Sequence, residues 1–239
     1  GSTLLNLACT DTAFGCFVKG RFHSLVGDSD TGKSILALTT LCEAAINEDF
    51  DDYTLVYNNA ERGMLMDVKK HFPPLAPRLK IEMSDSPEQF YFNLEDYVKA
   101  GPCVYILDSM DALIAEADEK KFQKQKKAHE KEKDESGSYG TQKAKINANN
   151  LNRACSKIEK NGSILIIISQ THDNIGFGAM FQKKTRSGGR ALKFYNRAEV
   201  WLSVKETLYK SFKGKKIQIG SLTKAAVQKN HVTGKRRTV

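Results

Sequence analysis

The segment Gly27–Ser34 constrains this 239-residue chain more than any other. Its residues, GDSDTGKS, fit the pattern G-x-x-x-x-G-K-[ST]. The apolar run 22–26 before it predicts a buried strand, and apolar residues at three- and four-residue steps over 35–42 predict a helix after it. Two glycines let backbone N–H groups converge on an anion, and the helix N-terminus adds its positive dipole end. We therefore expect this segment to bind the phosphates of a nucleotide.

Each residue type in the pattern has a physical task. Lys33 is expected to reach the β- and γ-phosphates, and the Ser34 hydroxyl is expected to hold Mg²⁺. Asp108 ends another apolar run and is expected to orient Mg²⁺ or its water, although a strand-terminal Asp that caps the next segment is the alternative. The expected nucleotide-binding residues are Gly27, Asp28, Ser29, Asp30, Thr31, Gly32, Lys33 and Ser34.

The order of apolar runs and helical patterns predicts an α/β fold, with a central, mostly parallel sheet flanked by helices. The length suits a single domain over residues 1–239. The pair Gly1-Ser2 is typical of a cleaved tag, and we expect both natural termini to be truncated. Strands are predicted at 22–26, 53–57, 79–83, 104–109, 163–170 and 198–205, with 216–220 and 225–229 as a closing hairpin-like pair. Helices are predicted at 35–47, 64–71, 86–100, 141–160 and 191–196.

The formal net charge of +9 favours a polyanionic partner besides the nucleotide, most simply nucleic acid. A basic protein without such a partner is the alternative. Five scattered cysteines favour a reducing compartment and argue against zinc and against a disulfide framework. Without a membrane-length apolar run, the protein is expected in the cytoplasm. The charge-dense segment 116–136 is either a solvated helix or a disordered insertion.

Residues 171–187 are predicted to form a long loop, and a loop of that length in a compact domain is usually functional. It combines glycines and aromatic residues with basic side chains, a mixture that suits a nucleic-acid backbone and bases. The residues expected to contact DNA there are Phe181, Lys183, Lys184 and Arg186.

Several landmarks occur in one order along the chain. They are the phosphate loop, Ala60-Glu61, the strand Ile106–Ser109, the step Ile168–Gln170, the run Gly188–Tyr195 (GGRALKFY), and Lys229–His231. In this combination the chain resembles the ATPase core of RecA/RadA-type recombinases, from about Leu4 to its end. The resemblance implies a RecA-like phosphate-loop NTPase core.

The resemblance also implies catalytic roles. Glu61 would activate the attacking water, and Gln170 would sense the γ-phosphate and couple it to the following loop. Lys229 and His231 would reach the ATP of a neighbouring subunit, adding positive charge to the transition state. Lys193 and Phe194 would lie at the same subunit junction.

For DNA, the resemblance implies two binding loops, at 136–141 and 171–188. Backbone contacts would come from Lys145, Asn149 and Asn152 on the helix after the first loop. Gly188, Gly189 and Arg190 would meet phosphates through N–H groups and a guanidinium.

The expected function is a DNA-dependent ATPase that binds ATP, Mg²⁺ and single-stranded DNA as a homo-oligomeric filament. It would pair that strand with homologous duplex DNA in recombination and repair. Two alternatives stay open: a hexameric helicase with Arg236 or Arg237 as its arginine finger, and a non-catalytic mediator or regulatory ATP-binding domain. His231 stands where the family has lysine, and Val68 where bacterial members stack a Tyr on adenine. These departures favour a divergent member, with a phage gene as one source.

Overall fold

The computed structural model describes residues 2–64, 66–129, 141–173, 184–186 and 188–239. Those residues form a seven-stranded central sheet in the order β3-β2-β4-β5-β1-β8-β9. The neighbouring strands are parallel up to β8, and β8 pairs with β9 in the antiparallel sense. The predicted α/β fold with a mostly parallel sheet is therefore confirmed.

The middle of the sheet consists of β4 (Cys103–Asp108), β5 (Ile164–Ser169) and β1 (Phe22–Gly27), each buried along its whole length. Strands covered on both faces read as continuous apolar runs, which is why they were predictable from sequence. The outer strands are β2 (Thr54–Asn59), β3 (Leu79–Glu82), β8 (Ala198–Phe212) and β9 (Lys215–Asn230).

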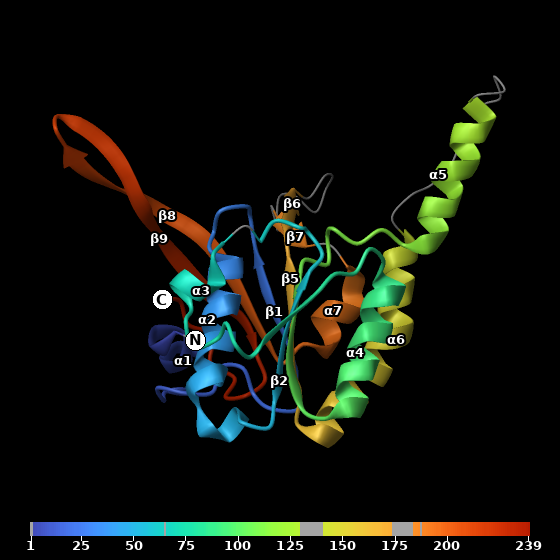
Figure 1. Cartoon of the computed structure of the whole chain (residues 1–239), viewed down its shortest axis with the longest axis horizontal. Coiled ribbons are helices and arrows are strands. Elements are labelled where there is room, and N and C mark those ends of the chain that lie inside the picture. Colours follow the sequence, from blue (N-terminus) through green and yellow to red (C-terminus); the bar gives the residue numbers. More distant parts are fainter. Residues whose placement is uncertain (1, 65, 130–140, 174–183, 187) are drawn as a thin grey trace.

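Helices cover both faces of the sheet (Figure 1). One face carries α1 (Thr3–Thr10), α2 (Lys33–Ile46) and α3 (Val68–His71), and the short η1 (Glu48–Phe50) follows α2. The other face carries α4 (Pro87–Ala100), α6 (Thr141–Asn161) and α7 (Gly189–Tyr195), while α5 (Glu116–His129) points away from the body. Two hydrophobic clusters, one on each face, hold these layers together. None of the described helices is long and apolar enough to cross a membrane.

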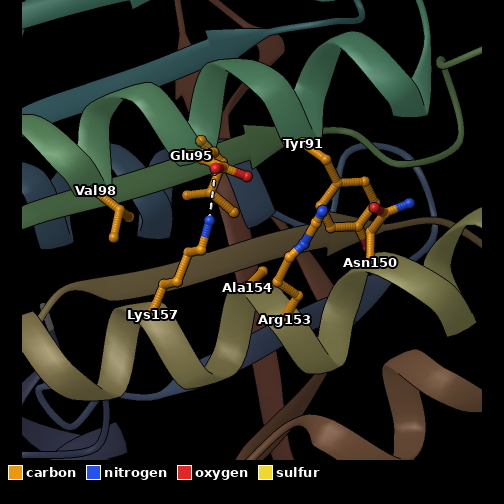
Figure 2. Close-up of a pocket in the computed structure, with 8 residues that line it drawn as sticks. Tyr91, Glu95, Val98, Asn150, Arg153, Ala154 and Lys157 are labelled. Atoms are coloured by element: carbon orange, nitrogen blue, oxygen red, sulfur yellow. Dashed lines mark ion pairs between the residues drawn. The ribbon is translucent and has the colours of Figure 1, made fainter.

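An ion-pair cluster joins α4 to α6 (Figure 2). The Glu95 carboxylate lies 2.6 Å from Lys157 Nζ on α6 and 2.9 Å from Lys99 Nζ on its own helix. The hydrogen bonds from Lys157 and then Lys99 lower the pKa of Glu95 to about 2. The start of α4 follows its sequence signal, because the Ser86 side chain accepts from Gln89 N at 3.1 Å and Pro87 is the first helical residue.

Three predicted boundaries were wrong. The segments 216–220 and 225–229 belong to one strand, β9, which pairs with an equally long β8. Both strands extend beyond the body as a two-stranded ribbon (Figure 1).

The helix predicted from residue 64 begins only at Val68, because the Asp67 side chain caps it by accepting from Lys70 N. The region predicted as a loop contains an antiparallel pair of strands, β6 (Thr171–Asp173) and β7 (Lys184–Arg186). Their polar composition predicted a loop, but hydrogen bonds between the two backbones make them strands. Of the charged segment 116–136, residues 116–129 form α5 and the remainder lies outside the described residues.

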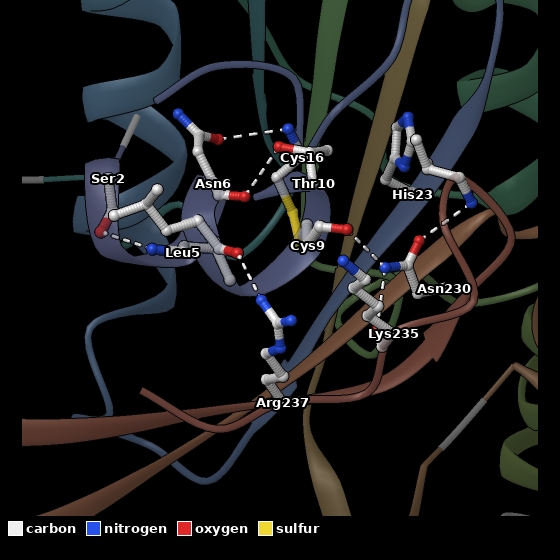
Figure 3. The surroundings of a disulfide bond; sticks show 12 residues. Ser2, Leu5, Asn6, Cys9, Thr10, Cys16, His23, Asn230, Lys235 and Arg237 are labelled. Atoms are coloured by element: carbon white, nitrogen blue, oxygen red, sulfur yellow. Dashed lines mark hydrogen bonds between the residues drawn. A yellow bond between two sulfur atoms is a disulfide. The ribbon is translucent and has the colours of Figure 1, made fainter. Parts of the chain in front are cut away.

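The prediction from the cysteines was wrong in one respect, because Cys9 and Cys16 form a disulfide (Figure 3). Asp11 ends α1 with φ 59°, and this left-handed turn returns the chain so that the two Cα atoms lie 5.2 Å apart. Spacing in the sequence does not reveal such a reversal. The Cys9 carbonyl also accepts from Asn230 Nδ2 at 2.8 Å, and this hydrogen bond joins the end of α1 to the end of β9.

Candidate functional site

The segment 27–34 lies between the end of β1 and the start of α2, as the sequence predicted. Gly32 adopts φ 85°, a left-handed conformation that glycine tolerates, and directs the chain into the helix. Gly27 is required for a different reason, since a Cβ there would lie 2.5 Å from the Leu202 carbonyl oxygen of β8. The two glycines therefore serve the loop's turn and its close packing on the sheet.

Ser34 and Asp108 are in direct contact. Asp108 Oδ2 accepts hydrogen bonds from Ser34 Oγ and from Tyr57 OH, each at 2.5 Å. Burial raises the pKa of Asp108, and the two hydrogen bonds and the Lys33 charge oppose that rise. Burial also raises the pKa of Tyr57, which keeps its hydroxyl a donor.

The oxygen donors at this point fit Mg²⁺. No group of three or more His, Cys, Asp or Glu residues in the described part of the chain could hold a metal. Mg²⁺ does not need one, because it keeps several waters and takes further oxygens from substrate phosphates. One hydroxyl and one carboxylate, Ser34 and Asp108, are a sufficient protein contribution.

Lys33 bonds to the loop itself. Its Nζ donates to the Asp28 carbonyl oxygen at 2.5 Å, and Thr31 Oγ1 donates to the same oxygen at 2.8 Å. Burial lowers the pKa of Lys33, while the charges of Asp108, Glu61 and Asp28 raise it. The ammonium group thus lies in a largely acidic setting at the start of α2.

Glu61, Ser109 and Gln170 meet at the carboxyl ends of three neighbouring strands. Glu61 N donates to the Asp108 carbonyl at 3.0 Å, which sets the residue beside β4. Its Oε1 then accepts from Ser109 Oγ and, at 3.1 Å, from Gln170 Nε2. Ser109 was not among the predicted site residues, and only its place directly after Asp108 could have suggested it.

A cavity of about 240 Å³ lies beside this cluster. Its lining includes the polar side chains of Ser34, Tyr57, Glu61 and Asp108, with Leu38, Met64 and Met66 on its apolar side. The metal-type oxygens and the exposed Glu61 therefore face one space. An anionic ligand held there by the loop would have a carboxylate within reach.

The β6–β7 hairpin stem contacts the loop and the sheet. The Asp28 carboxylate accepts from Thr171 Oγ1 of β6 and from Lys184 Nζ of β7. Arg186 is buried, with Nη2 3.1 Å from Glu199 Oε2 and Nη1 donating to Ser24 Oγ at 3.0 Å. Its side chain is only 6% exposed. An internal carboxylate therefore holds Arg186 in this structure, and the expectation that Arg186 contacts DNA stays a prediction. Phe181 and Lys183 lie outside the described residues.

The other residues expected to contact DNA lie on α6 and at the start of α7. Lys145, Asn149 and Asn152 are exposed on α6. Gly189 and Arg190 are exposed at the start of α7. Gly188 is buried with φ 88°, and a Cβ there would lie 2.1 Å from Leu192 Cδ1, so only glycine fits. Asn147 Nδ2 donates to the Gly188 carbonyl at 3.0 Å and joins α6 to this turn, a role that the sequence did not reveal.

Lys229 and His231 lie at the opposite end of the sheet from the phosphate loop. Lys229 Nζ donates to the carbonyls of Lys193 at 2.7 Å and Phe194 at 2.9 Å, and the Phe194 side chain is 72% exposed. Burial lowers the pKa of Lys229. Burial and the charges of Lys229, Arg197 and Arg236 lower the pKa of His231, so its imidazole is neutral at pH 7.

Comparison with known proteins identifies a family and several relatives. The family model for the RecA N-terminal domain matches residues 1–239. Among curated relatives, a plasmid RecA of Lactococcus lactis is 26% identical over 202 residues, covering 83% of this chain and 52% of the relative. The RecA of Helicobacter hepaticus is 28% identical over 237 residues, covering 97% and 61%. The RecA of Mycoplasmopsis pulmonis is 29% identical over 210 residues, covering 87% and 55%. The chain thus spans between half and about three fifths of these relatives.

Proposed function

The chain belongs to the RecA family, and from that membership we propose that it is a DNA-dependent ATPase that assembles on single-stranded DNA with ATP bound. The observation that carries this proposal is the meeting of Glu61, Ser109 and Gln170 beside the Ser34–Asp108 pair. The three curated relatives are named RecA and are 26%, 28% and 29% identical to this chain. The site's own geometry supports the proposal beside the family membership.

In this proposal the segment 27–34 holds the triphosphate through its backbone N–H groups and the Lys33 ammonium. Ser34 and Asp108 would hold Mg²⁺, which supplies positive charge to the phosphate oxygens when bound. Glu61 orients a water and accepts its proton as that water attacks the γ-phosphate. The bonds from Ser109 and Gln170 hold the Glu61 carboxylate in one orientation.

The DNA contacts in this proposal come from the surface that α6, α7 and the hairpin share. Lys145, Asn149, Asn152, Gly189 and Arg190 would bind the backbone, together with Phe181 and Lys183, which come before β7 in the sequence. Gln170 directly precedes β6, so a change in its contact on ATP binding would reach the hairpin. Such a filament in the cytoplasm would pair its strand with homologous duplex DNA during recombination and repair.

The two alternatives differ in how copies assemble. A helicase ring needs an arginine finger, but Arg237 Nη1 donates to the Leu7 carbonyl at 3.3 Å and is paired with Asp11. That internal engagement weighs against Arg237 as the finger and leaves the exposed Arg236 as the candidate for a helicase. Electron micrographs with an ATP analogue and single-stranded DNA separate the readings, since filaments, rings and single particles correspond to recombinase, helicase and mediator.

The catalytic role is tested with Glu61→Gln. The amide keeps the shape but cannot accept the water's proton, so we expect DNA-stimulated turnover to fall by about 100-fold or more. Affinity for an ATP analogue should be retained. The matched control is Glu48→Gln, at an exposed glutamate of η1 outside the site. If Glu61→Gln turns over ATP as fast as the wild type, Glu61 does not have the assigned role. If single-stranded DNA does not change ATP turnover by the wild type, the proposed function is wrong.

A further inference from the structure

The phosphate loop carries an acidic side chain next to the position where we place a polyanion. Asp28 directly follows Gly27, and its backbone carbonyl accepts from Lys33 and Thr31. Its carboxylate points to the hairpin stem, where Thr171 and Lys184 both donate to it. One residue therefore joins the loop, the phosphate-binding lysine and the hairpin.

The charge of Asp28 matters because like charges repel. The hydrogen bonds from Lys184 and Thr171 and the nearby Lys184 and Lys33 charges hold the pKa of Asp28 below its usual range, so the group is ionised at neutral pH. An ionised carboxylate on the loop opposes the binding of a triphosphate. The Lys184 ammonium, in direct contact, cancels that charge as long as the hairpin stem lies against the loop.

The stem has a fixed end from which Lys184 reaches the loop. Two residues further along β7, Arg186 is buried against Glu199 of β8 and Ser24 of β1. Backbone pairing of Asp173 with Lys184 and of Thr171 with Arg186 holds the two donors on neighbouring strands. Lys184 is 45% exposed and Asp28 50%, so the contact can open without disturbing the core.

We propose that Asp28 and Lys184 form a charge-neutralising clamp through which the docked β6–β7 hairpin raises the affinity of the phosphate loop for nucleotide. The inference rests on the proposed function, because it takes the loop as a nucleotide site. Both are positioning residues, since Lys184 acts through Asp28. Coupling free energies are reciprocal, so bound nucleotide in turn favours the docked hairpin. This route is separate from the contact between Gln170 and Glu61, which does not involve the loop.

The test is a double-mutant cycle with Lys184→Met, Asp28→Asn and the pair, measured as affinity for a fluorescent ATP analogue with Mg²⁺ and without DNA. Lys184→Met leaves the carboxylate uncompensated, so we expect affinity to fall by roughly 5- to 10-fold. Asp28→Asn removes the opposing charge and supplies the second background of the cycle, against its own affinity. In that background, Lys184→Met should cause no fall.

Other outcomes overturn the clamp. An equal fall in both backgrounds would mean that Lys184 contacts the nucleotide directly or only supports the hairpin, and no fall in the wild-type background would mean that the pair is inert. Thr171→Val removes the second donor and provides an independent variant, with a smaller fall that Asp28→Asn again abolishes. Lys205→Met, at an exposed lysine of β8, is the matched control and should leave affinity unchanged.

The clamp and the proposed function fail separately. If the effects of the two substitutions on nucleotide affinity are additive while the wild type shows DNA-stimulated turnover, only the clamp is wrong. Nucleotide binding with the expected cycle but without DNA-stimulated turnover would end the proposed ATPase role alone. A wild-type protein that does not bind the analogue would overturn both.

Discussion

His23 illustrates, at the scale of single residues, how burial changes the chemistry of one side chain. It is the second residue of β1 and has no exposed surface, and its Nε2 accepts from Val18 N at 3.0 Å. Burial, with a smaller effect from the Arg21 charge, lowers the pKa of His23 to about 4, although the backbone contact with Val18 opposes this. The imidazole is therefore neutral in the folded protein at pH 7.

This burial predicts a stability that depends on pH. In the unfolded chain the histidine takes up a proton below about pH 6.5, whereas in the folded chain it does so only near pH 4. Between these values the unfolded state binds more protons, so the free energy of unfolding falls as the pH falls. The full effect is about 3 kcal/mol.

Urea unfolding at about pH 7.5 and about pH 5 measures this effect against other titrating groups. The control is His23→Gln, which keeps an acceptor for Val18 N–H but does not titrate. Wild type should lose more stability than this variant on acidification. If both lose the same amount, His23 does not contribute in this pH range.

Residues with a fixed spacing in a motif were predictable at the candidate site, and their partners were not. The sequence indicated Lys33, Ser34 and Asp108 because a strand, a glycine-rich turn and a helix leave a local pattern. Tyr57 and Ser109 carry no such pattern, since they reach the site only when β2 and β4 lie side by side. The pairing of Asp28 with Lys184 joins residues separated by 156 positions and depends on a hairpin that the sequence did not predict.

At the scale of elements, a buried polar cluster holds the hairpin stem on the sheet. Glu199 of β8 accepts from Asn196 Nδ2 at 2.6 Å and Trp201 Nε1 at 2.7 Å, and it pairs with Arg186 at 3.1 Å. Both side chains of the ion pair are 6% exposed. The guanidinium thus compensates a carboxylate that has almost no access to water.

Removal of one partner from this pair should be strongly destabilising. Arg186→Met leaves the Glu199 charge buried without its cation, and we expect a loss of about 3–5 kcal/mol of unfolding free energy. The combined variant Arg186→Met with Glu199→Gln should lose less, because no uncompensated charge remains. Urea unfolding of the wild type, Arg186→Met, Glu199→Gln and the combined variant measures the difference. A combined variant that loses the sum of the two single losses would show that the charges act independently.

The elements that the sequence predicted well are those with a strong local signal. The start of α4 has its capping serine and proline, and β5 has an unbroken apolar run. The long ribbon of β8 and β9 was predicted as shorter pieces, because its outer half is exposed on both faces and has no buried face to mark its full length. Register shifts near Glu206 and Tyr209 break the two-residue period further.

At the scale of the whole molecule, the sheet separates Lys229 from the phosphate loop. A role of Lys229 in hydrolysis requires both at one ATP. Gly27 pairs with Leu202, whereas Lys229 pairs with Glu199 near the start of β8. Three residues along a strand correspond to roughly 10 Å, so Lys229 lies well below the edge that carries the phosphate loop. Within one copy the lysine instead binds the last carbonyls of α7. It can assist hydrolysis only at the loop of another copy.

Subunit mixing tests this arrangement. Lys229→Ala lacks the lysine that we propose acts on the neighbour, and Lys33→Ala lacks the lysine of the phosphate loop, so each variant alone should show almost no DNA-stimulated turnover. In an equimolar mixture, a junction is intact where the loop comes from one variant and the lysine from the other. Random assembly through a heterologous interface makes roughly a quarter of junctions intact, and we expect that share of wild-type turnover.

The mixture also distinguishes action between subunits from a structural role of Lys229. If the lysine only held the end of α7 in its own copy, every loop in the mixture would belong to a copy that lacks one of the two groups. Turnover would then stay at the level of the separate variants. Because mixing changes neither variant's own fold, recovered turnover can arise only where two copies share one nucleotide, and that sharing is the geometry that a head-to-tail filament requires.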